Sequence, residues 1–240
     1  MNIDNKKIYN KKWQDWQDMK KYGPMSRWTK KLIAKIINDL DYKNVLDVGC
    51  GEGSTILKIF HDKNIEVAGA DFSRRALEIA SEKNPHYSFY YLDITKNNLS
   101  EKNFDLVICS EVLEHVEDID SSIKNLSKLT GQYLVITGPQ GQMRKSEKYV
   151  GHLRNLDLKY LKQLLDKNDL RIINKYEWGF PFYSPLYRDL IDKFEKFHRS
   201  ISEGSYNPLQ KTIALIIYFI FYFNSYKKGD QLVILAKKLN

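Results

Sequence analysis

Apolar and polar positions alternate along the chain in two patterns, and these predict its secondary structure. Short apolar runs rich in β-branched residues predict strands, and stretches with apolar residues three and four positions apart predict amphipathic helices. The expected strands cover residues 45–48, 65–70, 88–92, 104–110, 133–137, 170–176 and 231–236. The expected helices cover residues 25–40, 55–61, 74–83, 119–129 and 158–165.

Strands and helices follow one another in alternation, which favours an α/β fold with a doubly wound, mostly parallel sheet. The run 104–110 is almost continuously apolar, as expected of a central strand that is covered on both faces. A length of 240 residues suits one domain. We expect an N-terminal helical lid or cap (1–43), a cofactor-binding core (44–177), a substrate-side insertion (178–230) and a final strand (231–237).

The segment before the first strand has no place in this alternation. Trp13, Trp16 and Met19 are three residues apart and predict one face of a short helix. Two interpretations remain open, because this helix could simply pack against the domain or could close over a pocket as a lid.

The insertion contains an unbroken apolar run of 11 residues, 213–223. This run is well short of the ~20 residues that span a bilayer. We expect a core helix or a dimer contact. A helix that lies on a membrane surface is the alternative, because Lys211, Lys227 and Lys228 flank the run.

The most informative stretch is 44–54, NVLDVGCGEGS, in which a short strand runs into Gly49, Gly51 and Gly53. A strand, a glycine-rich turn and a helix together form a pocket for a nucleotide-like ligand, because glycine permits close approach and the helix N-terminus offers N–H groups. Asp47 lies inside the strand, where an unpaired carboxylate is costly, so we expect it to accept hydrogen bonds from the loop. The spacing excludes the dinucleotide pattern G-x-G-x-x-G, since Ser54 stands where its last glycine would be.

Two acids follow at the ends of later strands. Asp71 comes 20 residues after Gly51, the distance at which an acid binds ribose hydroxyls in nucleotide-binding α/β folds. Asp93 closes the third strand and is placed to meet an adenine amino group. The carboxyl ends of parallel strands meet at one crevice, so we expect the glycine loop and both acids to face the same ligand.

The combined pattern resembles the class I S-adenosylmethionine-dependent methyltransferases. It consists of VLDVGCGEG, Asp71 after GA, Asp93 in LDI, and FDLVICSEVLEHV, and it covers about residues 45–137. The resemblance implies S-adenosylmethionine as cofactor and a seven-stranded sheet whose last strand, 231–236, is antiparallel.

The resemblance also implies the cofactor contacts. The loop with Gly49, Cys50, Gly51 and Gly53 would pass the methionine moiety, and Asp71 would bind the ribose. The remaining expected contacts are Phe72 against the adenine, Asp93 and Ile94 at the adenine edge, and Asp47 and Ser110 at the ends of their strands. The stretch GPMSR resembles a subgroup whose N-terminal segment closes over the cofactor. Arg27 is therefore a candidate for its carboxylate, which a guanidinium can bind through two hydrogen bonds.

A cluster of acids and histidines follows the fourth strand. Glu111, Glu114 and His115 share one face in a helical turn, and with His152 they offer two carboxylates and two imidazoles to a divalent metal. The spacing resembles metal-dependent O-methyltransferases acting on quinone precursors and small-RNA 2′-O-methyltransferases. Many family members carry similar residues without a metal, so we expect none and keep this site as the alternative.

Methyl transfer requires an enzyme mainly to position the acceptor and to remove its proton. Histidine is suited to take a proton near neutral pH. We therefore expect His152 as the general base before His115, with Glu111 as a further catalytic candidate. The alternative for each histidine is a structural hydrogen bond.

The composition narrows the partners. The formal charge is +8, but the lysines are scattered, which favours a solvated surface over a nucleic-acid interface. Cys50 and Cys109 are expected to be reduced thiols, and residues 1–13 lack the apolar core of a signal peptide, so we expect a cytoplasmic protein.

We therefore expect a cytoplasmic methyltransferase that modifies a hydroxyl of a small molecule or of a sugar- or phosphate-bearing intermediate. The resemblance alone suggests surface polysaccharide or natural-product biosynthesis. Two alternatives remain open, an RNA 2′-O-methyltransferase with a Glu/His metal site and a non-catalytic protein that binds S-adenosylmethionine. Expected partners are a small-molecule acceptor, a second copy of the chain and a peripheral membrane contact, but not nucleic acid.

Overall fold

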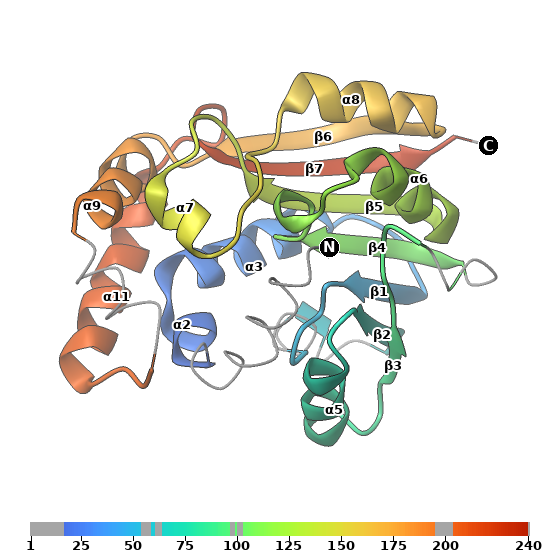
Figure 1. Ribbon diagram of the computed structural model, residues 1–240, viewed down its shortest axis with the longest axis horizontal. Coiled ribbons are helices and arrows are strands. Elements are labelled where there is room, and N and C mark those ends of the chain that lie inside the picture. Colours follow the sequence, from blue (N-terminus) through green and yellow to red (C-terminus); the bar gives the residue numbers. More distant parts are fainter. Residues whose placement is uncertain are drawn as a thin grey trace.

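The computed structural model describes residues 17–53, 59–60, 64–96, 99, 103–194 and 204–239. Trp13 and Trp16 lie outside the described residues, as does most of the expected helix 55–61. The described part of the chain contains one sheet with the strand order β3-β2-β1-β4-β5-β7-β6 (Figure 1). The strands are β1 (Asn44–Val48), β2 (Glu66–Asp71), β3 (Ser88–Tyr91), β4 (Phe104–Ser110), β5 (Thr130–Pro139), β6 (Leu170–Trp178) and β7 (Gln231–Lys238).

The strand directions confirm the predicted fold class. The first five strands pair in parallel, whereas β7 lies antiparallel between β5 and β6. The sheet is thus a doubly wound, mostly parallel, seven-stranded sheet with an antiparallel last strand, which is the Rossmann-like methyltransferase arrangement expected from the sequence.

Helices cover both faces of the sheet (Figure 1). They are α2 (Gln17–Tyr22), α3 (Pro24–Ile36), α5 (Arg74–Lys83), α6 (Ile119–Leu129), α7 (Lys145–Tyr149), α8 (Leu158–Lys167), α9 (Arg188–Lys193) and α11 (Pro208–Ile220), with the short helices η1 (Leu113–His115), η2 (Phe182–Tyr187) and η3 (Phe221–Phe223). One apolar cluster contains side chains of α6 and α8, and the other contains side chains of α3 and the aromatic residues of the insertion.

Polar residues begin several of these helices as their types predict. Ser73, Asp118 and Asp157 each accept a hydrogen bond from a backbone N–H in the first turn of α5, α6 and α8, respectively. Such a cap satisfies an N–H group that the helix itself leaves unpaired, and it sets the start of the helix.

The central position of β4 follows from its sequence. Leu106, Val107, Ile108 and Cys109 are all fully buried, because β4 lies between β1 and β5 with helices on both faces. Both cysteines of the chain are free and buried thiols.

The apolar run of the insertion is not a core helix, so that one of the two expected roles is wrong, and the dimer contact stays a prediction. Ala214 is the one buried residue of α11, and much of the helix's apolar surface faces outward. The inner side packs on the N-terminal helices, where the Trp28 indole N–H donates to the Tyr218 carbonyl (2.9 Å) and the Trp28 ring stacks on Trp178 (5.1 Å between centroids). Among the described residues, no helix combines the length and the hydropathy needed to cross a bilayer.

We expect Ile108→Ala to lower the free energy of unfolding by about 2–5 kcal/mol, because it leaves a cavity in the centre of the sheet. Ile173→Ala, at an exposed position of β6, is the matched control and should change it by less than about 0.5 kcal/mol. Equilibrium denaturation with urea measures both. Equal effects of the two substitutions would contradict the assignment of β4 to the core.

Candidate functional site

A cavity of about 460 Å³ opens where the carboxyl ends of β1, β2, β4 and β5 meet. Helices α2 and α3 form one wall of this cavity, and α7 and α9 contribute to another. A volume of this size suits a small molecule, and strand carboxyl ends are where open α/β sheets bind ligands. The structure brings most of the expected site residues to its walls: Gly49, Cys50, Asp71, Phe72, Asp93, Ile94, Ser110, Glu111, His115 and His152.

The glycine loop after β1 is fixed by Asp71 at the end of β2. The Asp71 carboxylate accepts hydrogen bonds from the amides of Gly51 (2.9 Å) and Ser73 (2.8 Å). Gly49 has φ +75°, and a Cβ at this position would lie 2.2 Å from the Val112 side chain. The loop therefore requires glycine at this point, both for its backbone angle and for its close packing.

Asp47 does not hold the loop as we expected. Its side chain is buried under the loop, and its Oδ2 atom has no hydrogen-bond partner. Burial, with the nearby charge of Asp71, raises the pKa of Asp47 to about 7. The Gly51 amide of the loop donates to Asp71 instead. Asp71 ends β2 beside the loop, whereas Asp47 lies inside β1 opposite Gly69, two residues before Asp71.

The loop after β3 presents Asp93 and Ile94 to the cavity. Asp93 accepts hydrogen bonds from the Thr95 amide (3.1 Å) and the Thr95 hydroxyl (2.7 Å). Partial burial opposes ionisation, but these hydrogen bonds outweigh it and lower the pKa of Asp93. The carboxylate is therefore ionised at neutral pH and available to accept a hydrogen bond from a ligand.

Arg27 does not line the cavity, in contrast to our expectation from GPMSR. Its guanidinium stacks over the Tyr218 ring at 3.9 Å, on the side of α3 that faces α11. Ser26 and Lys30, four residues apart, lie on the side of α3 that does line the cavity. On an α-helix Arg27 is rotated by about 100° from Ser26 and by about 60° from Lys30. The motif therefore identified the right helix, but the side of the helix that faces the cavity was not predicted correctly.

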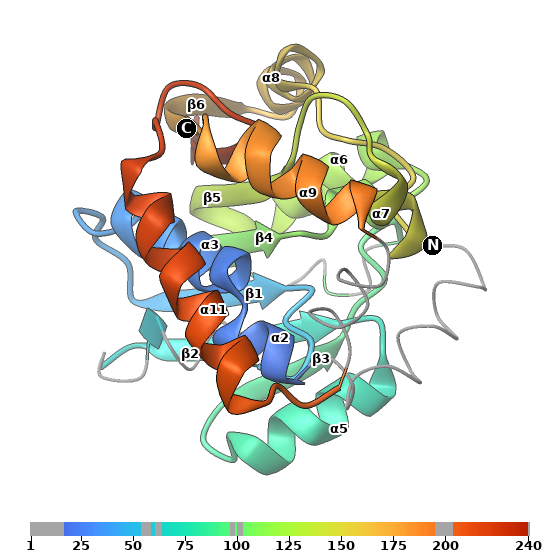
Figure 2. The ribbon, with the colours of Figure 1, turned by 90° about the vertical axis from the view of Figure 1, so that its left-hand side faces the viewer.

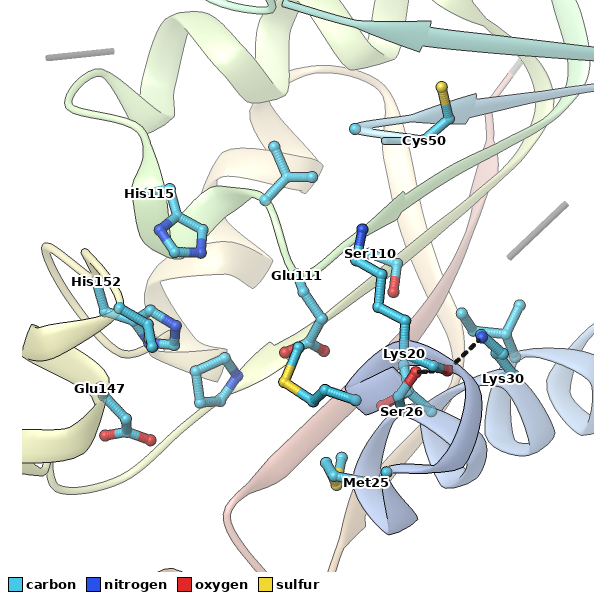
Figure 3. Close-up of a pocket in the computed structure, with 18 of the residues that line it drawn as sticks. Lys20, Met25, Ser26, Lys30, Cys50, Ser110, Glu111, His115, Glu147 and His152 are labelled. Carbon is cyan, nitrogen blue, oxygen red and sulfur yellow. Dashed lines mark hydrogen bonds between the residues drawn. The ribbon is translucent and has the colours of Figure 1, made fainter. Parts of the chain in front are cut away.

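Two lysines of α2 and α3, Lys20 and Lys30, line the cavity, and no sequence motif indicated them. Lys20 lines the cavity from α2, and its backbone carbonyl accepts hydrogen bonds from the Ser26 hydroxyl (2.9 Å) and the Lys30 ammonium (3.1 Å) (Figure 3). Burial lowers the pKa of Lys20 to about 8, partly offset by attraction to Glu52 and Asp71. The one sequence feature that could have indicated Lys20 is its position directly after the predicted helix face of Trp13, Trp16 and Met19.

Glu111 points into the middle of the cavity (Figure 3). Its Oε1 atom accepts hydrogen bonds from the Thr137 hydroxyl (2.9 Å) and the Gln231 amide (2.7 Å). Its backbone has φ +56°, an uncommon conformation for a residue with a side chain. Enclosure by the cavity walls raises the pKa of Glu111 even though both hydrogen bonds oppose the rise.

Glu114, His115 and His152 form a second polar group at the same wall. Each residue offers one possible ligand atom, and these three atoms lie within 4.8 Å of one another. The structure thus brings together three of the four residues expected for a metal, and Glu111 is not part of this group. The rings of His115 and His152 meet edge to face at 4.6 Å between centroids. Both Glu114 carboxylate oxygens and the Nδ1 atom of His152 are buried without a hydrogen-bond partner.

The protonation of this group is set by burial. Burial lowers the pKa of His115 to about 4 and, together with the positive charge of neighbouring groups, that of His152 to about 3. His115 Nδ1 lies 3.1 Å from the Gly151 carbonyl, which can only accept, so Nδ1 carries the proton and Nε2 does not. Burial, with the charge of Glu111, raises the pKa of Glu114. Neutral imidazoles and an unpaired carboxyl are the donor set that a divalent cation would take.

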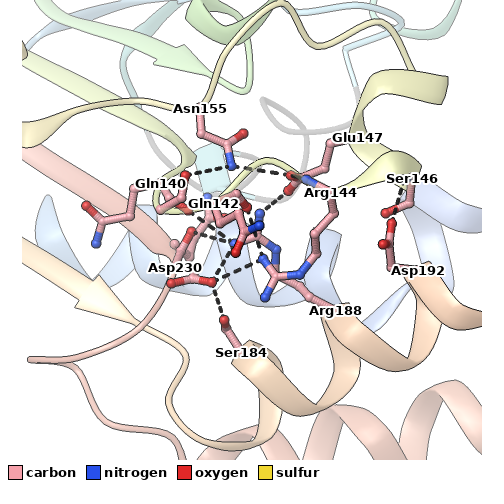
Figure 4. A network of polar contacts seen from close by, with 12 residues as sticks. Gln140, Gln142, Arg144, Ser146, Glu147, Asn155, Ser184, Arg188, Asp192 and Asp230 are labelled. Atoms are coloured by element: carbon pink, nitrogen blue, oxygen red, sulfur yellow. Dashed lines mark hydrogen bonds and ion pairs between the residues drawn. The ribbon is translucent and has the colours of Figure 1, made fainter.

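The insertion contributes a wall that no motif indicated. Arg188 of α9 is buried and forms ion pairs with Glu147 of α7 and with Asp230 (3.0 Å) before β7 (Figure 4). Arg144 pairs with the same Asp230 (3.2 Å) and with Asp189 (2.8 Å). This network joins three segments that are distant in sequence, and it neutralises both arginines within the protein.

Comparisons with known proteins agree with this geometry. Residues 46–132 match the family model described as a methyltransferase domain. A ubiquinone biosynthesis O-methyltransferase from Alkalilimnicola ehrlichii is 29% identical over 191 residues, which cover 76% of this chain and 72% of that protein. One from Rickettsia conorii is 37% identical over 111 residues, which cover 43% of this chain and 38% of that protein. The chain thus spans most of the first relative and about two fifths of the second.

A solved structure covers nearly the whole chain. The N-methyltransferase NodS from Bradyrhizobium japonicum, in complex with S-adenosyl-L-homocysteine, has a TM-score of 0.65 and 14% identity, over 98% of this chain and 99% of that one. The fold and the cavity at the strand ends define a doubly wound α/β domain with a nucleotide-type ligand site. Residues 46–132 therefore match a methyltransferase domain, and the chain has the fold of S-adenosylmethionine-dependent methyltransferases, which its motifs resemble.

We expect the rings of His115 and His152 to stay neutral from pH 8 to about pH 5 in the metal-free protein, because their pKa values are about 4 and about 3. Below pH 6.5 the unfolded chain binds protons that these folded rings do not, so their contribution to stability falls as the pH drops from 6.5 towards 4. Ring-carbon NMR spectra across this range measure the protonation, and His115→Gln and His152→Gln assign the signals. A midpoint near 6.5 for either ring would contradict the burial described.

Proposed function

We propose that this methyltransferase transfers the methyl group of S-adenosylmethionine to a hydroxyl of a small, largely apolar acceptor of phenolic type. The observation that carries the proposal is one cavity with an acidic cofactor side and an aromatic acceptor side. Asp71 and Asp93 line the first, and Tyr183, Tyr187 and Ile191 line the second.

The cofactor side suits a nucleoside that carries a sulfonium. Asp71 keeps unused lone pairs on a carboxylate that is already anchored by Gly51 and Ser73, so it can accept hydrogen bonds from ribose hydroxyls. Asp93, Ile94 and Phe72 would enclose the adenine. Lys20, rather than Arg27, would meet the carboxylate of the cofactor.

The acceptor side suits an apolar ring better than a phosphate or a sugar. The buried Arg188 pairs with Glu147 and Asp230, and the half-buried Arg144 beside it pairs with Asp189 and Asp230. Among the described residues, neither arginine is therefore left for an anion. The remaining wall is aromatic and aliphatic. The names of the relatives point the same way, since both belong to ubiquinone biosynthesis, and neither is named for polysaccharide or natural-product biosynthesis.

S-adenosylmethionine supplies the electrophilic methyl group when it is bound, so the chain has to orient the acceptor and accept its proton. We assign the proton to the Glu111 carboxylate. Enclosure raises its pKa towards the working range of a general base, and the hydrogen bonds from Thr137 and Gln231 hold its other oxygen in place. His152, our first candidate from the sequence, would be a weak base at neutral pH because its pKa is about 3.

The group of Glu114, His115 and His152 fits a divalent cation, because its buried oxygens and ring nitrogen have no other use in the described structure. A cation held there would act as a Lewis acid and make the acceptor hydroxyl easier to ionise. This proposal reverses our expectation that no metal binds.

We expect Asp71→Asn to weaken S-adenosyl-L-homocysteine binding by at least about tenfold, because it removes the charge that holds both the loop and the ribose. Isothermal titration calorimetry measures the affinity. Asp166→Asn, at an exposed acid of α8, is the matched control and should bind as the unsubstituted protein does. Heat of equal size for both variants, or none for the unsubstituted protein, would exclude the cofactor site.

We expect Glu111→Gln to lower kcat by about 10²–10⁴, the usual contribution of a general base, while the affinity for S-adenosyl-L-homocysteine changes less than twofold. The assay uses radiolabelled S-adenosylmethionine with a panel of catechols, sugar phosphates and small RNA. The rising limb of kcat with pH should reflect a carboxyl with a raised pKa and should be lost in Glu111→Gln.

Glu117→Gln, an exposed glutamate after η1, is the control for this substitution and should keep full activity. The same assay after chelation tests the cation, since unchanged turnover would exclude it from catalysis. Transfer to RNA but not to catechols would favour the RNA alternative, and no transfer with intact cofactor binding would favour the non-catalytic one.

A further inference from the structure

Exposed large apolar side chains gather on one face of the molecule. Of the 17 such residues in the described structure, 12 lie between Phe180 and Phe223. They belong to η2, α9, α11, η3 and the adjoining residues, and α9 and α11 lie on the same side of the molecule in both views (Figures 1 and 2). We call this the α9–α11 face. A cluster of this kind marks an interaction surface, because single exposed apolar residues are common but contiguous patches are not.

The outward side of α11 is apolar along its whole length. Leu209 is 67% exposed, Ile216 54%, Phe219 56% and Phe223, in η3, 76%. These residues recur at helical spacing, with Ile213 and Ile220 also exposed between them. A surface helix normally turns polar residues outward, so α11 has the orientation expected of a helix whose outer side meets an apolar medium.

The edges of this face carry positive charge without acids. The sequence has no Asp or Glu from Met19 to Asn38 or from Gly204 to Gly229, whereas these two segments contain nine lysines and arginines. Lys20 and Lys30 line the cavity, so seven of the nine remain for the edges of the face. Lys31 lies over the Tyr222 ring (3.6 Å), Lys211 over Tyr22 (4.6 Å) and Lys228 over Phe180 (4.2 Å). Aromatic rings beside cations are the usual composition of a protein segment at a lipid headgroup layer.

Acids near this face are engaged elsewhere. Asp189 of α9 pairs with Arg144, Asp192 accepts a hydrogen bond from the Ser146 amide, and Asp18 of α2 accepts one from the Tyr206 amide. Arg144 neutralises Asp189, whereas Asp192 and Asp18 keep their negative charge. The described lysines at the edges of the face, Lys31, Lys35, Lys211, Lys227 and Lys228, outnumber these two acids, so the net charge there is positive and attracts an anionic surface.

We propose that the α9–α11 face docks on the surface of a membrane that contains anionic lipids. The apolar side chains of α11 and η3 enter the headgroup layer, and Lys35, Lys211, Lys227 and Lys228 lie near the lipid phosphates. The 13 residues of α11 extend for only about 20 Å, so the helix lies in the interface and does not cross the bilayer. This inference does not depend on the proposed reaction.

Charge favours a membrane over a second copy of the chain. In a twofold dimer each patch meets its own copy, so the lysines around α11 would face one another across the contact. An anionic lipid layer neutralises these charges instead, and each basic residue near such a layer strengthens binding about fivefold.

Flotation with vesicles tests the proposal. We expect the full chain to float with vesicles of phosphatidylcholine and phosphatidylglycerol, to bind at least tenfold more weakly to phosphatidylcholine alone, and to lose binding in high salt. Ile216→Ser/Phe219→Ser should abolish flotation. Ile173→Ser/Leu239→Ser, which removes two exposed apolar residues of other segments, is the matched control and should leave it unchanged.

Charge variants give an independent readout. Lys227→Gln/Lys228→Gln should weaken vesicle binding about 25-fold, whereas Lys124→Gln/Lys128→Gln on α6, with the same loss of charge, should leave it near normal. Thermal unfolding and light scattering on each variant show that it is folded and report its oligomeric state. Failure to float, equal effects of test and control variants, or a stable dimer dissolved by Ile216→Ser/Phe219→Ser would each overturn the proposal.

Discussion

The hydrogen bond from the Gly51 amide to the Asp71 carboxylate is the constraint on which the site depends. Because β1 and β2 are parallel neighbours, the loop after one and the acid that ends the other emerge side by side. The amides of Gly49 and Cys50 also bind the Ala70 carbonyl (2.8 and 3.1 Å), so the loop is tied to β2 through backbone and side chain. Glycines with positive φ would otherwise leave this loop many conformations. The cavity lies at the edge of the loop that these contacts fix.

The balance of charged side chains differs between the two sides of the cavity. Near β1 and β2, burial and the charge of Asp71 disfavour the ionisation of Asp47, and the charges of Lys20 and Lys30 oppose this effect only in part. Such a site is short of positive charge, and a cationic ligand would relieve it. Near β5 and β7, Arg188 and Asp230 balance each other inside the protein. The other residues that line this side include Tyr183, Tyr187 and Ile191, on which the proposal of an uncharged acceptor rests.

Local patterns in the sequence were enough to predict the strands, the central place of β4 and the acids at the strand ends, since strand periodicity and turn residues act over a few positions. The antiparallel direction of β7 was predicted from the family resemblance. The side of each helix that faces the cavity or the solvent could not be predicted from the sequence. The motif around Arg27 identified the right helix but not which side faces the cavity, and the apolar composition of α11 did not reveal that its apolar side faces outward. The Glu147–Arg188–Asp230 network joins residues more than 40 positions apart and has no sequence signature.

The strands β6 and β7 pair in register from their meeting end, with Trp178 opposite Gln231. The insertion 179–230 therefore begins and ends at adjacent points on the same edge of the sheet. An element attached in this way can be lengthened, shortened or exchanged at small entropic cost without moving the sheet or the glycine loop. Sequence changes confined to this insertion could thus alter the acceptor or the surface contacts during evolution, while the sheet and the glycine loop stay the same.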